Sequence, residues 1–94
     1  MSKEAPRIWC DFNAGLENGA YSLSTRGSRE SLARLAHGPS HGMSVILYTE
    51  DELEGGRPAL LLANGGLEVD DAGRWQARVQ KDTFRHEVSD AEPN

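Results

Sequence analysis

The sequence has a single cysteine and no long apolar run, and both features limit the classes of protein to which it can belong. Cys10 has no second cysteine for an internal disulfide, which fits a reducing compartment. No stretch approaches the roughly 20 apolar residues of a membrane span. No basic start followed by an apolar segment indicates a secretory signal. We therefore expect a cytoplasmic protein with no membrane partner.

Basic residues are scarce in the second half of the chain. Residues 1–42 carry five Lys and Arg against four Asp and Glu, whereas residues 43–94 carry five against eleven. Seven of these carboxylates lie between Glu50 and Asp71, where Arg57 is the only basic residue. Because such a surface repels phosphate groups, we expect no nucleic-acid partner.

Signatures of catalysis, nucleotide binding and metal binding are also missing. The chain has neither G-x-x-x-x-G-K-[ST] nor G-x-G-x-x-G, and its histidines and cysteine lack the spacing of a zinc site. Residues 38–42 match the letters G-x-S-x-G, but a nucleophile elbow needs a strand before its serine and a helix after it. The expected order here is the reverse. We therefore expect a protein that is not an enzyme and that binds neither a cofactor nor a metal.

The length of the chain predicts one domain. Its 94 residues suffice for one small hydrophobic core. The polar ends, residues 1–6 and 89–94, read as disordered tails around a β-rich body over residues 7–88.

The run GMSVILYTE, residues 42–50, predicts the central strand. Met43, Val45 and Leu47 would point to one side while Ile46 and Tyr48 point to the other, as in a strand that is covered on both faces. Alternating apolar residues and turn signals predict further short strands, over residues 7–13, 20–24 and 74–80, with a last strand or turn over 83–88.

One short helix is expected over residues 29–37. Ser28 suits its N-cap, Leu32, Leu35 and Ala36 give one apolar stripe, and Gly38 suits a left-handed end.

The segment from Ala59 to Asp70 allows two interpretations. Asn64-Gly65 is either a tight hairpin turn or a bulge in one long strand, and the bulged strand is favoured because residues 67–69 alone make a poor strand. Asp70 to Gly73 is the stronger hairpin signal.

Together these elements predict a mainly β fold with one short α-helix. Five to six short strands on so small a chain hide their edges best in a strongly curved antiparallel sheet or a small barrel. The runs RIWCDFNAG, GMSVILY and GRWQARV, with the helix after TRGS, resemble short uncharacterised bacterial proteins of unknown function. More loosely, they resemble SH3-like barrels. The resemblance implies a fold and no activity.

Two side chains of the first strand bear on function. Cys10 shares a face with Ile8 and Phe12, so we expect a buried, inert thiol. The same alternation turns Trp9 outwards, where it is either an exposed contact for a partner or covered by the helix or a terminal segment.

We expect a non-enzymatic protein-interaction module, a monomer or weak homodimer, whose acidic loops meet a basic protein partner. The expected contact residues are Trp9, Glu50, Asp51, Glu52, Glu54, Asp70 and Asp71. The alternative is a small enzyme or ligand-binding protein with a site near His37, His41 and Asp11. The acidic residues have a second interpretation, in which they keep the protein soluble and discourage strand edges from pairing.

Overall fold

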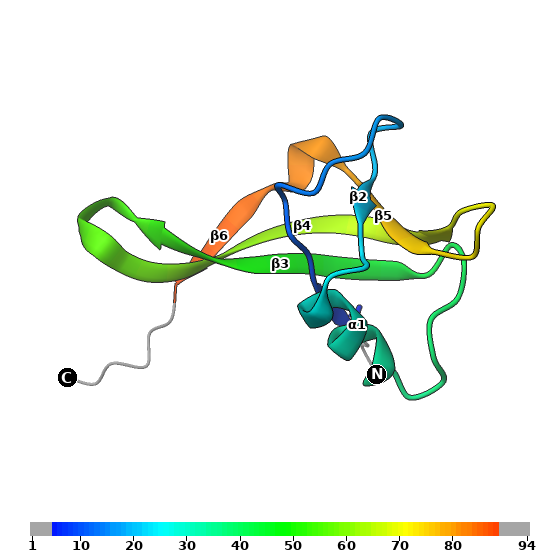
Figure 1. Cartoon of the computed structure of the whole chain (residues 1–94). Coiled ribbons are helices and arrows are strands. Elements are labelled where there is room, and N and C mark those ends of the chain that lie inside the picture. The colour runs from blue at the N-terminus through cyan, green and yellow to red at the C-terminus, as the bar shows by residue number, and fades with distance from the viewer. Residues whose placement is uncertain (1–4, 89–94) are drawn as a thin grey trace.

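A computed structural model describes residues 5–88 of the chain (Figure 1). Six strands, one α-helix and two single-turn 3₁₀-helices follow one another along these residues. In chain order they are β1 (Arg7–Trp9), β2 (Tyr21–Ser22), α1 (Arg26–Ala33), β3 (Ser44–Leu53), η1 (Glu54–Gly56), β4 (Arg57–Val69), β5 (Trp75–Val79), η2 (Lys81–Thr83) and β6 (Arg85–Val88). The prediction of a mainly β fold with one short helix is confirmed.

The sheet is built on the long hairpin of β3 and β4. Its strand order is β1-β3-β4-β5-β2, and β6 pairs with β4 beside β5. β5 pairs with residues 65–69 of β4, and β6 pairs with residues 59–62, so the two short strands share one edge of β4. The middle strand is therefore β4, and the expectation that residues 42–50 form the central strand is wrong.

The predicted closed or strongly curved antiparallel sheet is also wrong. β1 runs parallel to β3, which makes the sheet mixed. The outermost strands of the main path, β1 and β2, do not pair with each other among the described residues, so the sheet stays open. The physical reason is the length of β4, whose 13 residues take two successive partners along one edge and project, together with β3, beyond the other strands.

β4 is one long strand, as favoured from the sequence, but it contains no bulge against β3. The pairing with β3 runs without interruption from Ser44 opposite Gly66 to Leu53 opposite Arg57. Gly65 serves close packing instead: a Cβ atom there would lie 2.7 Å from the Arg78 carbonyl oxygen and 3.0 Å from Leu47 Cδ1.

The helix begins earlier than expected. Thr25 is its N-cap, because its side chain accepts a hydrogen bond from the Ser28 backbone N–H. Ser28 is not the cap but a buried residue, and its hydroxyl donates to the Trp9 carbonyl at 2.6 Å. The Trp9 backbone N–H donates to Ser31 Oγ at 3.0 Å. Two serines thus tie α1 to β1, an arrangement that the apolar stripe does not reveal.

Three other predicted elements are found where the sequence placed them, although β1 and β6 are shorter than predicted. β1 ends at Trp9 because the chain turns at Asp11, whose carboxylate accepts the Asn13 N–H at 2.9 Å. The hairpin turn after β4 is confirmed: Asp70 and Arg74 are joined by a backbone hydrogen bond, and Gly73 has φ +81°. β6 confirms the last strand, and Phe84 precedes it as an exposed side chain in edge contact with Phe12.

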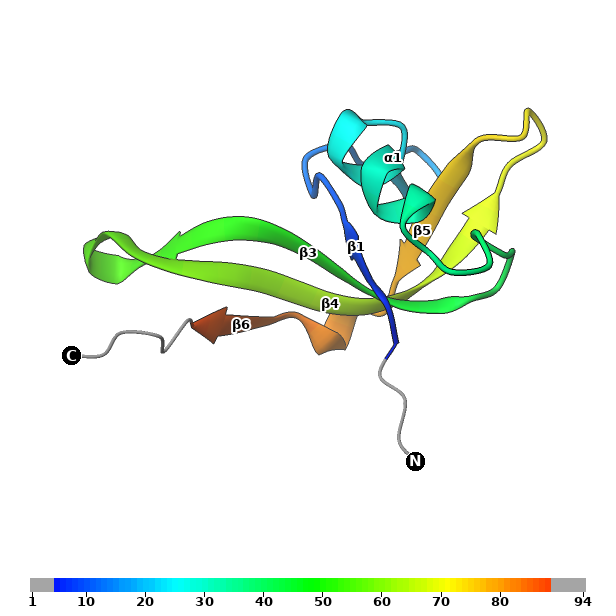
Figure 2. The ribbon, with the colours of Figure 1, turned by 90° about the horizontal axis from the view of Figure 1, so that it is seen from below.

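The hydrophobic core lies at one end of the molecule, between the sheet and α1 (Figure 2). Of the residues predicted on the inner faces of the first strand and of residues 42–50, Ile8, Cys10, Val45 and Leu47 are buried in it, whereas Phe12 and Met43 are partly buried and pack against it. The cluster consists of Ile8, Cys10, Leu23, Leu32, Val45, Leu47, Leu67 and Ala77. Gln76 is buried although it is polar: it lies in the sheet between Ser22 on β2 and Glu68 on β4, and Glu68 accepts its amide N–H at 2.9 Å.

The ends expected to be disordered, residues 1–6 and 89–94, fall almost entirely outside the described residues. Of the described ones, Pro6 accepts a hydrogen bond from the Ile46 N–H at 2.8 Å. No helix within residues 5–88 is long and apolar enough to cross a membrane.

Candidate functional site

The far part of the β3–β4 hairpin projects away from the core, and we call residues 49–62 with the adjoining β6 the hairpin arm (Figures 1 and 2). None of residues 49–58 is buried, yet the ladder between β3 and β4 continues through them to the end of the hairpin. Gly55 and Gly56, with φ +83° and +79°, allow the three-residue connection at its tip. Residues 49–58 of the arm are therefore held in place by backbone pairing rather than by a core.

A groove with an apolar floor and acidic margins crosses the hairpin arm. It encloses about 580 Å³ and is lined by Glu50, Asp51, Pro58, Ala59, Leu60, Glu87 and Val88. The register explains this composition. Leu60 lies directly between Glu50 on β3 and Glu87 on β6, so the three side chains share one face of the sheet. An apolar side chain is thus flanked on both sides by carboxylates.

The carboxylates of the groove are held by neighbours. Glu50 accepts the Trp9 indole N–H at 2.9 Å, and Asp51 Oδ2 lies 2.8 Å from His86 Nε2. Arg7 donates to both oxygens of Glu87 at 2.9 and 3.0 Å. These contacts hold the pKa of each carboxyl below its ordinary value: the first cause is the bond from Trp9 for Glu50, from His86 for Asp51 and from Arg7 for Glu87. All three remain ionised at neutral pH.

Charge is compensated unevenly along the hairpin arm. The Glu87 carboxylate faces a guanidinium, whereas Glu50 is bonded to a neutral indole. The exposed side chains of Glu52 and Glu54 have no hydrogen-bond or ion-pair partner among residues 5–88. The margin of the groove on the β3 side therefore keeps an excess of negative charge.

Trp9 lies half-buried under α1 and is not an open apolar anchor. A Cβ atom on Gly27 would approach its ring to 2.9 Å, so the helix backbone packs directly on the indole. Of the two sequence expectations for Trp9, the structure agrees with coverage by the helix. Its N–H still reaches the hairpin arm through Glu50, which links the core to the groove.

The second acidic segment lies at the opposite end of the hairpin, so the expected contact residues do not form one surface (Figure 1). Asp70 is a turn residue there: its Oδ1 accepts the backbone N–H groups of Ala72 and Arg74, both at 2.9 Å. These contacts lower its pKa, the bond from the Arg74 backbone first. Asp71 is exposed in the same turn.

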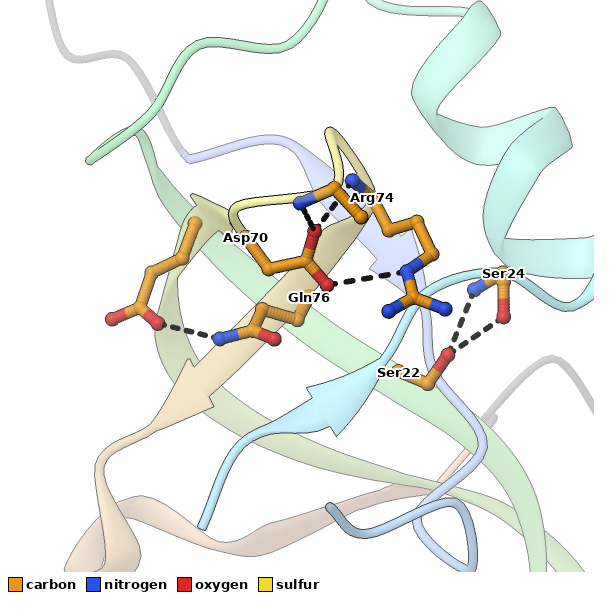
Figure 3. Close-up of polar contacts among 7 residues, drawn as sticks. Ser22, Ser24, Asp70, Arg74 and Gln76 are labelled. Carbon is orange, nitrogen blue, oxygen red and sulfur yellow. Dashed lines mark hydrogen bonds and ion pairs between the residues drawn. The ribbon is translucent and has the colours of Figure 1, made fainter. Parts of the chain in front are cut away.

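A small polar hollow borders this turn, and the sequence did not indicate it (Figure 3). It encloses about 240 Å³ and is lined by Leu16, Asn18, Ser22, Ser24, Asp70, Arg74, Trp75 and Gln76. Its polar groups mostly bond one another. Arg74 Nε donates to Asp70 Oδ2 at 3.2 Å, and the hydroxyls of Ser22 and Ser24 lie 2.7 Å apart.

The residues of the alternative site, His37, His41 and Asp11, are engaged separately. His41, which precedes β3, accepts the Val69 N–H through its Nδ1 at 3.1 Å, and the Asp11 carboxylate accepts the Asn13 N–H in its own turn. His37 is exposed after α1. No hydrogen bond or ion pair joins any two of the three within residues 5–88, and the hollow that His41 lines includes neither of the others.

Cys10 is fully buried, and burial first, with the Asp11 charge second, raises its pKa to about 12. The thiol is therefore neutral at physiological pH, which agrees with the expectation of an inert side chain. In the part of the chain that the structure describes, no cluster of three His, Cys, Asp or Glu could hold a metal ion.

Several groove residues could not be found from the sequence. Glu87 and Val88 belong to a short strand whose partner and register leave no local pattern, and Leu60 reads simply as part of an apolar run. One feature of the sequence does point to this surface. At Tyr48 the apolar run of β3 gives way to carboxylates although the strand continues.

Fold and groove together define a small mainly β domain with one short helix and a projecting acidic hairpin. Comparisons with protein-family models, with curated proteins and with solved structures gave no match for this chain.

Proposed function

We propose that the protein is a non-enzymatic interaction module that binds a basic segment of a protein partner in the groove of its hairpin arm. The observation that carries the proposal is the row Glu50, Leu60, Glu87, an apolar residue between two carboxylates on exposed strands. A lysine or arginine has the complementary form, since its apolar stem can lie on Leu60 while its charged head reaches a carboxylate.

The energetics of the hairpin arm support this proposal. Residues 49–58 contribute no buried side chain to the core, so folding alone gives little reason for extending the hairpin so far. An ion pair within the protein supports it too, because the Arg7 side chain reaches from β1 across this face to the Glu87 carboxylate on β6. Glu50, Glu52 and Glu54 leave room for further cations towards the tip.

The proposal is tested with two variants of equal charge change. The arm variant carries Glu50→Gln, Glu52→Gln and Glu54→Gln, and the control carries Glu17→Gln, Glu30→Gln and Asp82→Asn at exposed positions away from the groove. The probe is a synthetic peptide of about eight residues with alternating lysine and valine, long enough to follow the exposed part of β3. Association rates are measured across a salt series.

The arm variant should lose about tenfold or more in association rate at low salt, because carboxylates near the binding surface steer a cationic partner. The control variant should lose much less. Equal losses in both variants would show that net charge alone attracts the peptide, and the groove would then have no special role.

A further inference from the structure

Along the outer edge of β3, the pairing with β1 ends at Tyr48. The edge beyond this residue indicates how a partner docks. Up to that point β1 covers the edge: the Ile46 N–H donates to the Pro6 carbonyl at 2.8 Å, and the Cys10 N–H donates to the Tyr48 carbonyl at 2.9 Å. Backbone N–H and C=O groups of every second residue point to the same side of a strand. Glu50 and Glu52 therefore direct theirs towards the same outer edge.

No strand pairs with this part of the edge among residues 5–88, because the β1 ladder ends with Trp9 opposite Tyr48. Nearby carboxylates face the two outward donors instead. Asp51 Oδ1 accepts the Glu52 N–H at 2.9 Å. The Glu50 carboxylate accepts the Trp9 indole N–H and lies close enough to its own backbone N–H for that group to lower its pKa. Within residues 5–88, no donor outside the β3–β4 hairpin bonds the carbonyl groups of Glu50 and Glu52.

We propose that the basic segment adds to residues 49–53 of β3 as an extra strand, continuing the line of β1. This inference rests on the function proposed above and assigns its binding mode. Carbonyl groups of the incoming strand replace the carboxylates as acceptors for the N–H groups of Glu50 and Glu52, and its own N–H groups bond the two open carbonyls. Its lysine or arginine side chains project onto the face that Glu50 and Glu52 share with Leu60, where they pair with these two carboxylates at the margin of the groove.

Charge complementarity decides between a basic strand and a second copy of this chain. A second copy paired edge to edge would bring Glu50, Asp51 and Glu52 opposite the same acidic residues, and like charges directly opposite one another are unfavourable. A strand with alternating cations meets no such repulsion. Its other side chains project from the opposite face of the extended sheet.

The test uses the lysine–valine peptide and two N-methylated forms of it, one methylated at every valine and one at every lysine. Both forms keep the charges and side chains, but each loses the N–H groups along one edge. Strand addition predicts that one form loses tenfold or more in affinity while the other retains binding. It also predicts that the unmodified peptide slows hydrogen exchange at the Glu50 and Glu52 N–H groups at least tenfold.

Two results separate the inference from the function on which it rests. If both methylated forms bind as well as the unmodified peptide and exchange at Glu50 and Glu52 is unchanged, strand addition is wrong while the acidic groove stands. If the unmodified peptide shows no salt-dependent binding to the wild-type protein, the proposed function itself is wrong.

Discussion

At the scale of single residues, Gly65 shows how one position constrains the fold. It lies where β4 pairs on both edges, with Val45 on one side and Val79 on the other. The backbone of β5 approaches so closely that any Cβ atom at residue 65 would overlap the Arg78 carbonyl oxygen. From the sequence, Asn64-Gly65 indicates a turn or a bulge, because the sequence alone does not distinguish a glycine needed for close packing from one needed for a turn.

Gly65→Ala should therefore destabilise the protein by about 1–3 kcal/mol, since backbone must shift to admit the methyl group. Gly66→Ala is the matched control, because a Cβ atom there would lie 3.7 Å from its nearest neighbour, an ordinary contact. Chemical denaturation of both variants measures the difference. Equal stability of the two variants would show that β4 and β5 are not packed this closely.

Cys10 gives a second prediction at this scale. Its thiol has a pKa of about 12 in the folded protein against 9.0 unperturbed, so the unfolded chain ionises first as pH rises. The thiol's contribution to stability is complete below pH 9.0 and is lost progressively up to about pH 12. Modification of Cys10 by a thiol reagent at neutral pH should proceed only as fast as the protein opens. Rapid labelling under native conditions would contradict the burial of β1.

At the scale of elements, local patterns predicted the inner face of β3 and the turn after β4, because alternation and turn chemistry are local. The start of α1 was missed because Ser28 looks like an N-cap, whereas the structure uses its hydroxyl to bond β1. The length of β3 was missed for a related reason. Residues 51–53 are poor strand formers, and only their pairing with residues 57–59 makes them a strand.

The contact between Trp9 and Glu50 predicts a pH response of β3. The pKa of Glu50 is lowered, so its ionised form stabilises the fold above its unperturbed value of 4.5, and this contribution is lost as pH falls below that value. The indole N–H signal of Trp9 in NMR spectra should shift with this titration. In Glu50→Gln, which keeps an acceptor but no charge, the shift should disappear. A titration unchanged by the substitution would show that another group is responsible.

The acidic edge of β3 also predicts how the free protein avoids self-association. Replacing Glu50, Asp51 and Glu52 by Gln, Asn and Gln removes the repulsion that opposes edge-to-edge pairing. The variant should dimerise at lower concentration than the wild-type protein in sedimentation velocity. The triple variant of Glu17, Glu30 and Asp82 controls for the change in net charge. If neither variant associates more than the wild-type protein, the carboxylates do not protect this edge.

At the scale of the whole molecule, the sequence predicted the fold class but not the shape. Strand count and helix count follow from local signals, whereas closure depends on which strands meet, and β6 pairs with β4 through a register that no local pattern encodes. The acidic residues show the same difference between closeness in sequence and arrangement in space. Seven carboxylates crowd one stretch of sequence, but β3 and β4 carry them to opposite ends of a hairpin. Absence of nucleic-acid binding stays a prediction.

We propose that the hairpin arm, and no other surface within residues 5–88, receives the basic partner. NMR titration of the ¹⁵N-labelled protein with the lysine–valine peptide tests it most directly, because every backbone amide reports on its own surroundings. If the peptide binds the hairpin arm, shift changes should concentrate in residues 49–60 and 85–88 and fade as salt is added. Changes that centre instead on the turn at residues 70–74 or on α1 would contradict it.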